Sequence, residues 1–179
     1  MSTRSAGADP PTDRSPVTDA TPASPRPAAP ASDADRTVSS EAVLSDEAVE
    51  LFRRRGVGAL AEKMGIEILE MSAERAVGRM PVAGNTQPVG ILHGGAHVVL
   101  AETLGSVAAN VHAGAGRLAM GIELNASHSR SAATGWVTGT CTAVHLGRTL
   151  TTHQVVMTDD DGRLLSTVRI TNYLTDSRG

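Results

Sequence analysis

Cysteine and aromatic residues are nearly absent from this chain of 179 residues. Cys141 is the only cysteine, so no disulfide can form within the chain, and a lone thiol fits a reducing compartment. Phenylalanine, tyrosine and tryptophan together make up 2% of the residues. We therefore expect a hydrophobic core built from alanine, valine, leucine, isoleucine and methionine.

Long apolar runs and a strong net charge are missing as well. No stretch approaches the roughly 20 apolar residues of a membrane span, and the first residues lack the apolar run of a secretory signal. The net charge of −3, with 20% charged residues, provides no basic field for nucleic acid. We therefore expect a cytoplasmic protein, and the length suits one domain of ordinary size.

The first 40 residues differ in composition from the rest of the chain. They are rich in proline, alanine and serine, and Val17 and Val38 are their only apolar side chains apart from Met1 and the alanines. Such a segment cannot bury enough surface to offset the entropy lost on ordering. We expect residues 1–40 to be a disordered tail and residues 41–179 to form the folded domain.

The remaining sequence combines helix and strand patterns. Residues 46–64 predict a helix capped by Ser45 and interrupted at Gly56 and Gly58, while residues 94–112 are apolar on almost every face and predict a buried helix. One buried helix, two strands before it and a four-strand antiparallel meander after it make an α+β pattern. The strands are expected in residues 65–71, 75–82, 117–125, 134–146, 149–158 and 163–174.

Glu102 stands inside the apolar helix predicted over residues 94–112. A buried, unpaired carboxylate costs several kcal/mol, so this group should be paired, neutral or used in chemistry. Ser106 follows one turn later on the same face, within reach of Glu102 or of a water between them. A structural acid paired with an arginine or histidine is the alternative interpretation.

Gly94 opens the same helix, and its backbone N–H suits a developing oxyanion. Gly94 and Glu102 are eight residues apart, which places them roughly 12 Å apart along the helix axis. That distance is too long for both to act on one carbonyl within one chain. If the two groups cooperate, a symmetric dimer with two antiparallel helices side by side would bring them together.

The run QPVGILHGGAHVVLAETLGSVA, with NASHSRSA at 125–132 and HLGR at 145–148, resembles the hot-dog-fold acyl-CoA thioesterases. Among these PaaI-like enzymes, the match is to the branch of Arthrobacter-type 4-hydroxybenzoyl-CoA thioesterases and 1,4-dihydroxy-2-naphthoyl-CoA hydrolases. The resemblance implies a long helix wrapped by an antiparallel β-sheet, with active sites across a homodimer interface and further assembly into a homotetramer.

The resemblance also implies an activity, the hydrolysis of an aryl- or naphthoyl-CoA to the free acid and coenzyme A. No separate cofactor is expected, because coenzyme A is part of the substrate. A general medium-chain acyl-CoA thioesterase is the alternative.

By the same resemblance, five residues have catalytic roles. Glu102 is the nucleophile or the general base, and Gly94 N–H is the oxyanion donor. Gln87 and His93 orient and polarise the thioester carbonyl, and Ser106 positions the attacking water or the acyl group. Sequence alone leaves open whether Glu102 attacks the carbonyl or activates a water.

A second set of residues is implied to contact coenzyme A. Arg130 and Arg148 suit its phosphates, because a guanidinium group pairs well with phosphate oxygens, although each could be a solvated arginine at a strand end. His97 stands where the resemblance implies a small residue, which bears on the acyl pocket. The implied coenzyme A contacts are Gly121, His128, Ser129, Arg130, Ser131, His145, Leu146, Gly147, Arg148, Thr149 and Leu150.

Three alternative hypotheses, a metal site, an acyl-CoA sensor and a hydratase, fit the sequence less well. His93 and His97 have i, i+4 spacing and His112 lies further on, but zinc needs three or four convergent ligands, so no metal is expected. A non-catalytic acyl-CoA sensor on this fold would need an output domain, and residues 1–40 lack helical periodicity. A hydratase on this fold would use an aspartate and a histidine on the central helix, and that helix contains no aspartate.

Overall fold

Three helices and seven strands make up the part of the chain that the computed structural model describes, residues 37–177. None of these helices is long and apolar enough to cross a membrane. In chain order the elements are β1 (Val38–Leu44), α1 (Asp46–Arg55), α2 (Ala59–Lys63), β2 (Glu67–Met71), β3 (Arg75–Pro81), α3 (Gly94–Ala113), β4 (Arg117–His128), β5 (Trp136–Leu146), β6 (Leu150–Thr158) and β7 (Leu164–Asp176).

The first helical segment is divided as its two glycines predict. Ser45 caps α1, and its hydroxyl accepts a hydrogen bond from Ala48 N at 3.3 Å. The helix ends at Gly56, whose φ of 63° lies in the left-handed region that glycine adopts without strain. The chain resumes a helix, α2, only after Gly58.

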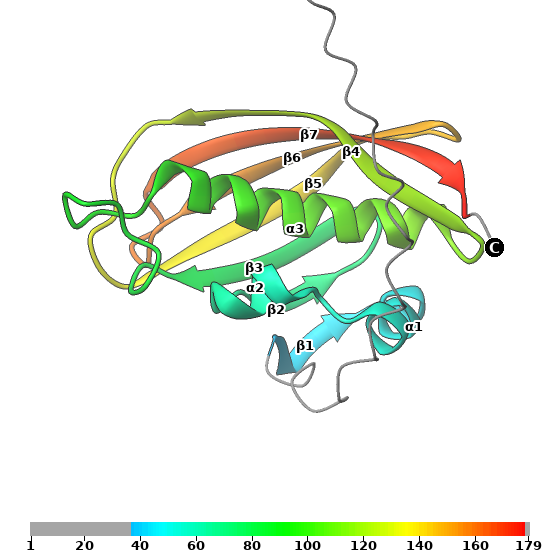
Figure 1. The fold of residues 1–179 in the computed structure, drawn as a ribbon, viewed down its shortest axis with the longest axis horizontal. Helices are drawn as coiled ribbons and strands as arrows, with labels where there is room; N and C mark the ends of the chain where they lie inside the picture. Colours follow the sequence, from blue (N-terminus) through cyan, green and yellow to red (C-terminus); the bar gives the residue numbers. More distant parts are fainter. Residues whose placement is uncertain (1–36, 178–179) are drawn as a thin grey trace, which may run out of the picture. The chain divides into compact units, whose positions relative to one another are not determined.

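The seven strands form one sheet in the order β1-β2-β3-β5-β6-β7-β4. Every pairing is antiparallel except that of β1 with β2. Helix α3 lies along one face of this sheet, as Figure 1 shows, and contacts β3 to β7. The expected α+β arrangement of a long central helix on a mostly antiparallel sheet is confirmed.

The four-strand meander expected after α3 is wrong in one respect. Strands β5, β6 and β7 follow one another as predicted, but β4 pairs with β7, along the register from Arg117↔Asp176 to His128↔Ser166. Strand β3 occupies the place beside β5. The long α3 carries the chain from β3 across the face of the sheet, so β4 starts at the far edge and not beside β5.

Two glycines let α3 come close to the sheet. Gly78 on β3 and Gly139 on β5 are direct partners in the register. A Cβ atom on either one would lie about 3 Å from a methyl group of Leu104, 2.9 Å for Gly78 and 3.0 Å for Gly139. Leu104 is fully buried in the space that these glycines leave, so it sets the distance between α3 and the strands.

The domain boundary expected at residue 40 is wrong, because β1 already begins at Val38. This strand pairs in parallel with β2, and Ile68 N donates a hydrogen bond to the carbonyl of the buried Thr37 at 2.7 Å. The apolar residues of β1 are too sparse to reveal a strand without the partner that it pairs with. The rest of the expected tail, residues 1–36, and residues 178–179 lie outside the described residues.

Candidate active site

The N-terminal end of α3 has one unoccupied backbone donor. His93 is the N-cap of this 20-residue helix, and its Nδ1 accepts a hydrogen bond from Gly95 N at 2.9 Å. Among the described residues, no acceptor binds the N–H of Gly94. A free N–H at the positive end of a long helix is suited to bind an oxyanion.

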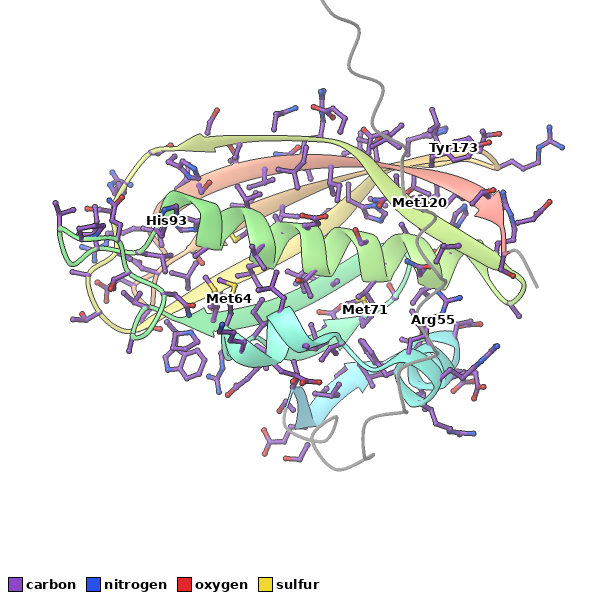
Figure 2. The ribbon with its side chains drawn as sticks, in the orientation of Figure 1. Arg55, Met64, Met71, His93, Met120 and Tyr173 are labelled. Atoms are coloured by element: carbon purple, nitrogen blue, oxygen red, sulfur yellow. The ribbon has the colours of Figure 1, made fainter. Side chains whose placement is uncertain are left out.

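The same hydrogen bond determines which nitrogen carries the hydrogen when the His93 ring is neutral. Because Nδ1 accepts a hydrogen bond, the neutral ring must carry its hydrogen on Nε2. The side chain is exposed, and Figure 2 shows it at the N-terminal end of α3. An Nε2–H donor is therefore available next to Gly94.

A pocket of about 400 Å³ opens at this end of α3. Predicted site residues from two distant parts of the sequence meet there, because β4 runs back along α3 and ends next to the helix start. Sequence reasoning missed Ile91 and Leu92 as lining residues and left the role of His97 open. The predicted residues that line the pocket are Gln87, Gly94, His128, Ser129, Arg130 and Ser131.

His128 is held by a short chain of hydrogen bonds. The Ser166 hydroxyl donates to the carbonyl of Ser127 at 3.0 Å, so it has no hydrogen left for the His128 Nδ1 that lies 3.0 Å away. Nδ1 must therefore carry the hydrogen, and Nε2 of the neutral ring is an acceptor. This Nε2 lies 3.0 Å from the position that a Cβ atom would take on Gly94.

His97 is the buried histidine of this pocket, with 3% of its surface exposed. Its ring centroid lies 5.4 Å from that of His128, and its Nδ1 has no partner among the described residues. Burial, and to a smaller extent the nearby His128, lowers the pKa of His97 from 6.5 to about 4. His97 is thus neutral at physiological pH.

The histidines considered for a metal site have different surroundings. His93 caps the helix at the surface, whereas His97 is buried against His128. In residues 37–177, no group of three or more histidine, cysteine, aspartate or glutamate side chains is arranged to hold a metal ion.

Glu102 lies about two turns further along α3 and next to β4. Its Oε1 is 3.8 Å from the position that a Cβ atom would take on Gly121. The side chain is exposed in the single chain, so the expectation of a buried carboxylate is wrong. Within residues 37–177 Glu102 forms no ion pair, which disfavours the structural-acid interpretation.

Ser106 lies one turn beyond Glu102 and has an unexpected partner. Its hydroxyl donates to Oδ1 of Asn172 at 3.3 Å, and Asn172 is fully buried on β7. Gly121 is the register partner of Asn172 on β4, so these four residues meet beside the middle of α3. The available signal was a polar residue at an inward position of β7, between Ile170 and Leu174.

The remaining predicted contacts lie at the opposite end of α3. The turn between β5 and β6 contains Gly147, whose carbonyl lies 3.0 Å from Nε2 of His112 in the last turn of the helix. Arg148 and Thr149 line a separate pocket there with Arg117 and Tyr173. The segment 145–150 is therefore about 27 Å along the helix from Gly94, too far to join the residues 128–131 around it in one chain.

Strand β4 is an open edge of the sheet next to Glu102. Two of its apolar side chains, Met120 and Ile122, are 52% and 60% exposed. Figure 2 shows Met120 on β4 near Tyr173 of the neighbouring β7. A long edge strand with exposed apolar residues is a surface typical of strand pairing between subunits.

Comparison with known proteins gives a consistent result. Residues 89–166, which include the α3 start, Glu102 and the segment 145–150, match the family model described as Thioesterase superfamily. The chain is 40% identical over 123 residues to the proofreading thioesterase EntH of Cronobacter turicensis, covering 68% of this chain and 90% of that protein. It is 38% identical over 127 residues to the 1,4-dihydroxy-2-naphthoyl-CoA hydrolase of Escherichia coli, covering 70% and 93% respectively.

The fold is also similar to that of solved thioesterases. A crystal structure of a Pseudomonas aeruginosa thioesterase superposes with a TM-score of 0.64 at 32% identity, covering 72% of this chain and 94% of that one. The helix and sheet described above are therefore a hot-dog arrangement, as the sequence resemblance implied.

Proposed function

Because the chain belongs to the thioesterase superfamily and is a thioester hydrolase, we propose that it cleaves an aryl- or naphthoyl-CoA to the free acid and coenzyme A. The observation that carries the hydrolase part of this proposal is a Gly94 N–H that lines a pocket and an exposed Glu102 on the same helix, neither of which has a partner within residues 37–177. The similarity to a naphthoyl-CoA hydrolase supports the aromatic acyl group.

In the proposed mechanism the thioester carbonyl binds at the start of α3. The N–H of Gly94 and Nε2–H of His93 donate to the carbonyl oxygen, and they stabilise the negative charge that develops there. Gln87 lines the same pocket and orients the thioester. These donors are fixed by the helix start before substrate binds, so little reorganisation accompanies the reaction.

Glu102 supplies the attacking group, either its own carboxylate oxygen or a water that it deprotonates. Ser106, one turn along, holds that water or the acyl group. A charged, accessible carboxylate is what either role requires, and the exposed position of Glu102 is compatible with both. The proposed reaction uses no separate cofactor, because coenzyme A is part of the substrate.

The proposed active unit is a homodimer with one site at each end of its interface. Pairing of the β4 edges would set the two α3 helices antiparallel, so Gly94 of one chain would face the partner subunit's Glu102. The helix spacing of roughly 12 Å within one chain motivates this arrangement. Two dimers paired back to back would give the tetramer that the resemblance implies.

The same dimer explains the separation of the coenzyme A contacts. The segment His128 to Ser131 lies beside Gly94, and the turn containing Arg148 lies at the far end of α3. In an antiparallel pair the partner's turn approaches the first chain's pocket. Arg130 and Arg148 are both exposed, and they would bind coenzyme A phosphates from two subunits.

The test begins with hydrolysis of benzoyl-, phenylacetyl-, dihydroxynaphthoyl- and aliphatic acyl-CoAs, followed by thiol detection. Glu102→Gln keeps the shape of the side chain and removes its basicity, so kcat should fall by roughly 10²–10⁴-fold while the melting temperature changes little. Glu62→Gln, on the exposed face of α2, is the matched control and should behave as the parent. A folded Glu102→Gln protein that keeps kcat within about tenfold of the parent would rule out this mechanism.

A further inference from the structure

Unsatisfied polar groups gather beneath the middle of α3. Four buried side-chain atoms lack a hydrogen-bond partner in residues 37–177, and three of them belong to Thr151, His153 and Asn172 on β6 and β7. Thr151 and Asn172 are direct cross-strand partners. An unsatisfied buried polar group destabilises the fold, so three of them on two neighbouring strands call for a functional explanation.

The amide of Asn172 has a hydrogen-bond partner at only one of its two ends among the described residues. Its Oδ1 accepts the hydrogen bond from Ser106 on α3, and its Nδ2 is buried without a partner. If the amide is turned by 180°, Nδ2 donates to the Ser106 hydroxyl and Oδ1 is left over. In either orientation, one end of the amide holds Ser106 and the other faces away from it.

Thr151 is the polar residue opposite Asn172 on β6, and no hydrogen bond joins the two side chains in the described residues. Side chains directly opposite in an antiparallel pair have Cβ atoms about 4.5–5.5 Å apart. The Thr151 hydroxyl is also buried and has no partner among the described residues. A hydroxyl can donate or accept, so it can match either orientation of the Asn172 amide.

At the end away from Thr151, the Asn172 amide comes close to the carboxylate of Glu102. Gly121 leaves a space bordered by Glu102 Oε1 and Asn172 Oδ1, each 3.8 Å from the position of a Cβ on Gly121. Ser106 stands one helical turn from Glu102 and is only partly buried. Its hydroxyl is therefore the group that connects the buried amide with the open side of α3.

We propose that Asn172 is a positioning residue for hydrolysis, which fixes the Ser106 hydroxyl from below, and that Thr151 is the group that holds the free end of its amide when substrate is bound. This inference rests on the proposed function of Glu102 and Ser106. A free serine hydroxyl samples several rotamers, and a fixed acceptor selects one of them. The Ser106 oxygen is then held where it can orient a water, or the acyl group, against Glu102.

The test is a double-mutant cycle on the full-length protein with the best acyl-CoA from the screen. Asn172→Ala should lower kcat about tenfold, the range of one lost hydrogen bond, with KM within about twofold. In a Ser106→Ala background the same change should have an effect below about twofold, because Asn172 acts through Ser106. Thr151→Val should reproduce part of the loss only while Asn172 is present.

Two controls separate positioning from loss of stability. Val168→Ala removes buried volume from the same face of β7, so it should lower the melting temperature and leave kcat per folded molecule unchanged. Asn172→Thr, made in parallel, keeps a polar oxygen on β7, so the cycle does not depend on the alanine variant folding. It should retain more activity than Asn172→Ala.

The outcomes are distinguishable from those of the proposed function. If Glu102→Gln abolishes turnover but Asn172→Ala and Asn172→Thr keep the parental kcat, the positioning role is wrong and the thioesterase mechanism stands. Multiplicative losses in the Ser106–Asn172 double variant would equally overturn it. If no acyl-CoA is cleaved, or if Glu102→Gln is active, the proposed function fails first.

Discussion

Two histidines near the start of α3, His93 and His97, have opposite environments. His93 is exposed and held by the helix start, whereas His97 is one turn further and almost completely buried. The buried ring lines the candidate pocket and faces His128 without a hydrogen-bond partner on its Nδ1 among the described residues. Its burial makes the stability of the fold depend on pH.

His97 should make the protein lose stability as the pH falls from about 6.5 to 4. Over this range His97 is protonated in the unfolded chain but stays neutral in the folded protein, where its pKa is about 4. Protons therefore favour the unfolded chain. The free energy of unfolding is unaffected by the titration of His97 above pH 6.5, and the full loss of stability is reached below pH 4. His153 acts in the same direction, because burial lowers its pKa too.

Urea unfolding at pH 7 and pH 4.5 measures this effect. His97→Gln should reduce the difference in unfolding free energy between the two pH values by about 2 kcal/mol. His145→Gln, which removes an exposed histidine, is the control for losing one imidazole. Equal pH dependence in His97→Gln and the parent would contradict the assignment.

The residues of the site differ in how far the sequence reveals them. His93, Gly94 and Glu102 stand in one helix with a capping residue at its start, so their spacing could be computed from the sequence. Asn172 could not be found in this way, because its contact with Ser106 joins residues 66 positions apart. The burial of Glu102 was misjudged because an apolar helix indicates how much surface is covered but not by which chain.

Among the elements, β4 is the strand whose existence the local sequence pattern predicted but whose place in the sheet it did not. Alternating apolar residues at 118, 120, 122 and 124 predicted a strand, and the strand exists. The pattern does not say which side is covered, and Met120 and Ile122 face outward. Its place at the edge beside β7 depends on pairing across about 50 residues, which no local pattern records.

If the β4 edge is the dimer contact, a charge at its centre should disrupt it. Ile122→Lys should shift the protein toward monomer and lower kcat/KM by more than about tenfold, because each site would lose the partner's Glu102. Val43→Lys is the matched control, because Val43 is also an exposed apolar residue, 71% against 60% for Ile122, and lies on the other edge strand, β1. Light scattering and activity measured over the same range of protein concentration test both, and a fully active monomer would contradict the shared site.

For the whole molecule, the folded domain extends further toward the N-terminus than composition indicated. The few apolar residues in Val38–Leu44 are enough for a strand once β2 offers a partner. Composition-based reasoning sums burial within a segment and cannot include burial against a distant one. The helices, the loop and the other strands were predictable because each carries its own periodicity or glycine signals.

Removal of residues 1–36 should leave kcat/KM within about tenfold of the parent, because their composition offers little surface to bury. Removal of residues 1–44 should in addition lower the melting temperature by several degrees, since it exposes the edge of β2 and takes away the bond from Ile68 N to Thr37 O. Thermal unfolding and steady-state kinetics on both truncations separate these outcomes. A loss above tenfold with residues 1–36 removed would assign them a function.

The contact of Leu104 with Gly78 and Gly139 fixes how high α3 stands above its own sheet. In the proposed two-fold dimer one gene encodes both helices, so any change in that height occurs in both subunits at once. When α3 shifts outward by a small distance in one subunit, it shifts by the same distance in the other. The spacing between the two halves of each proposed site then changes by twice that distance. We therefore expect substitutions at these two glycines, which lie in the core against Leu104, to lower turnover before they prevent folding.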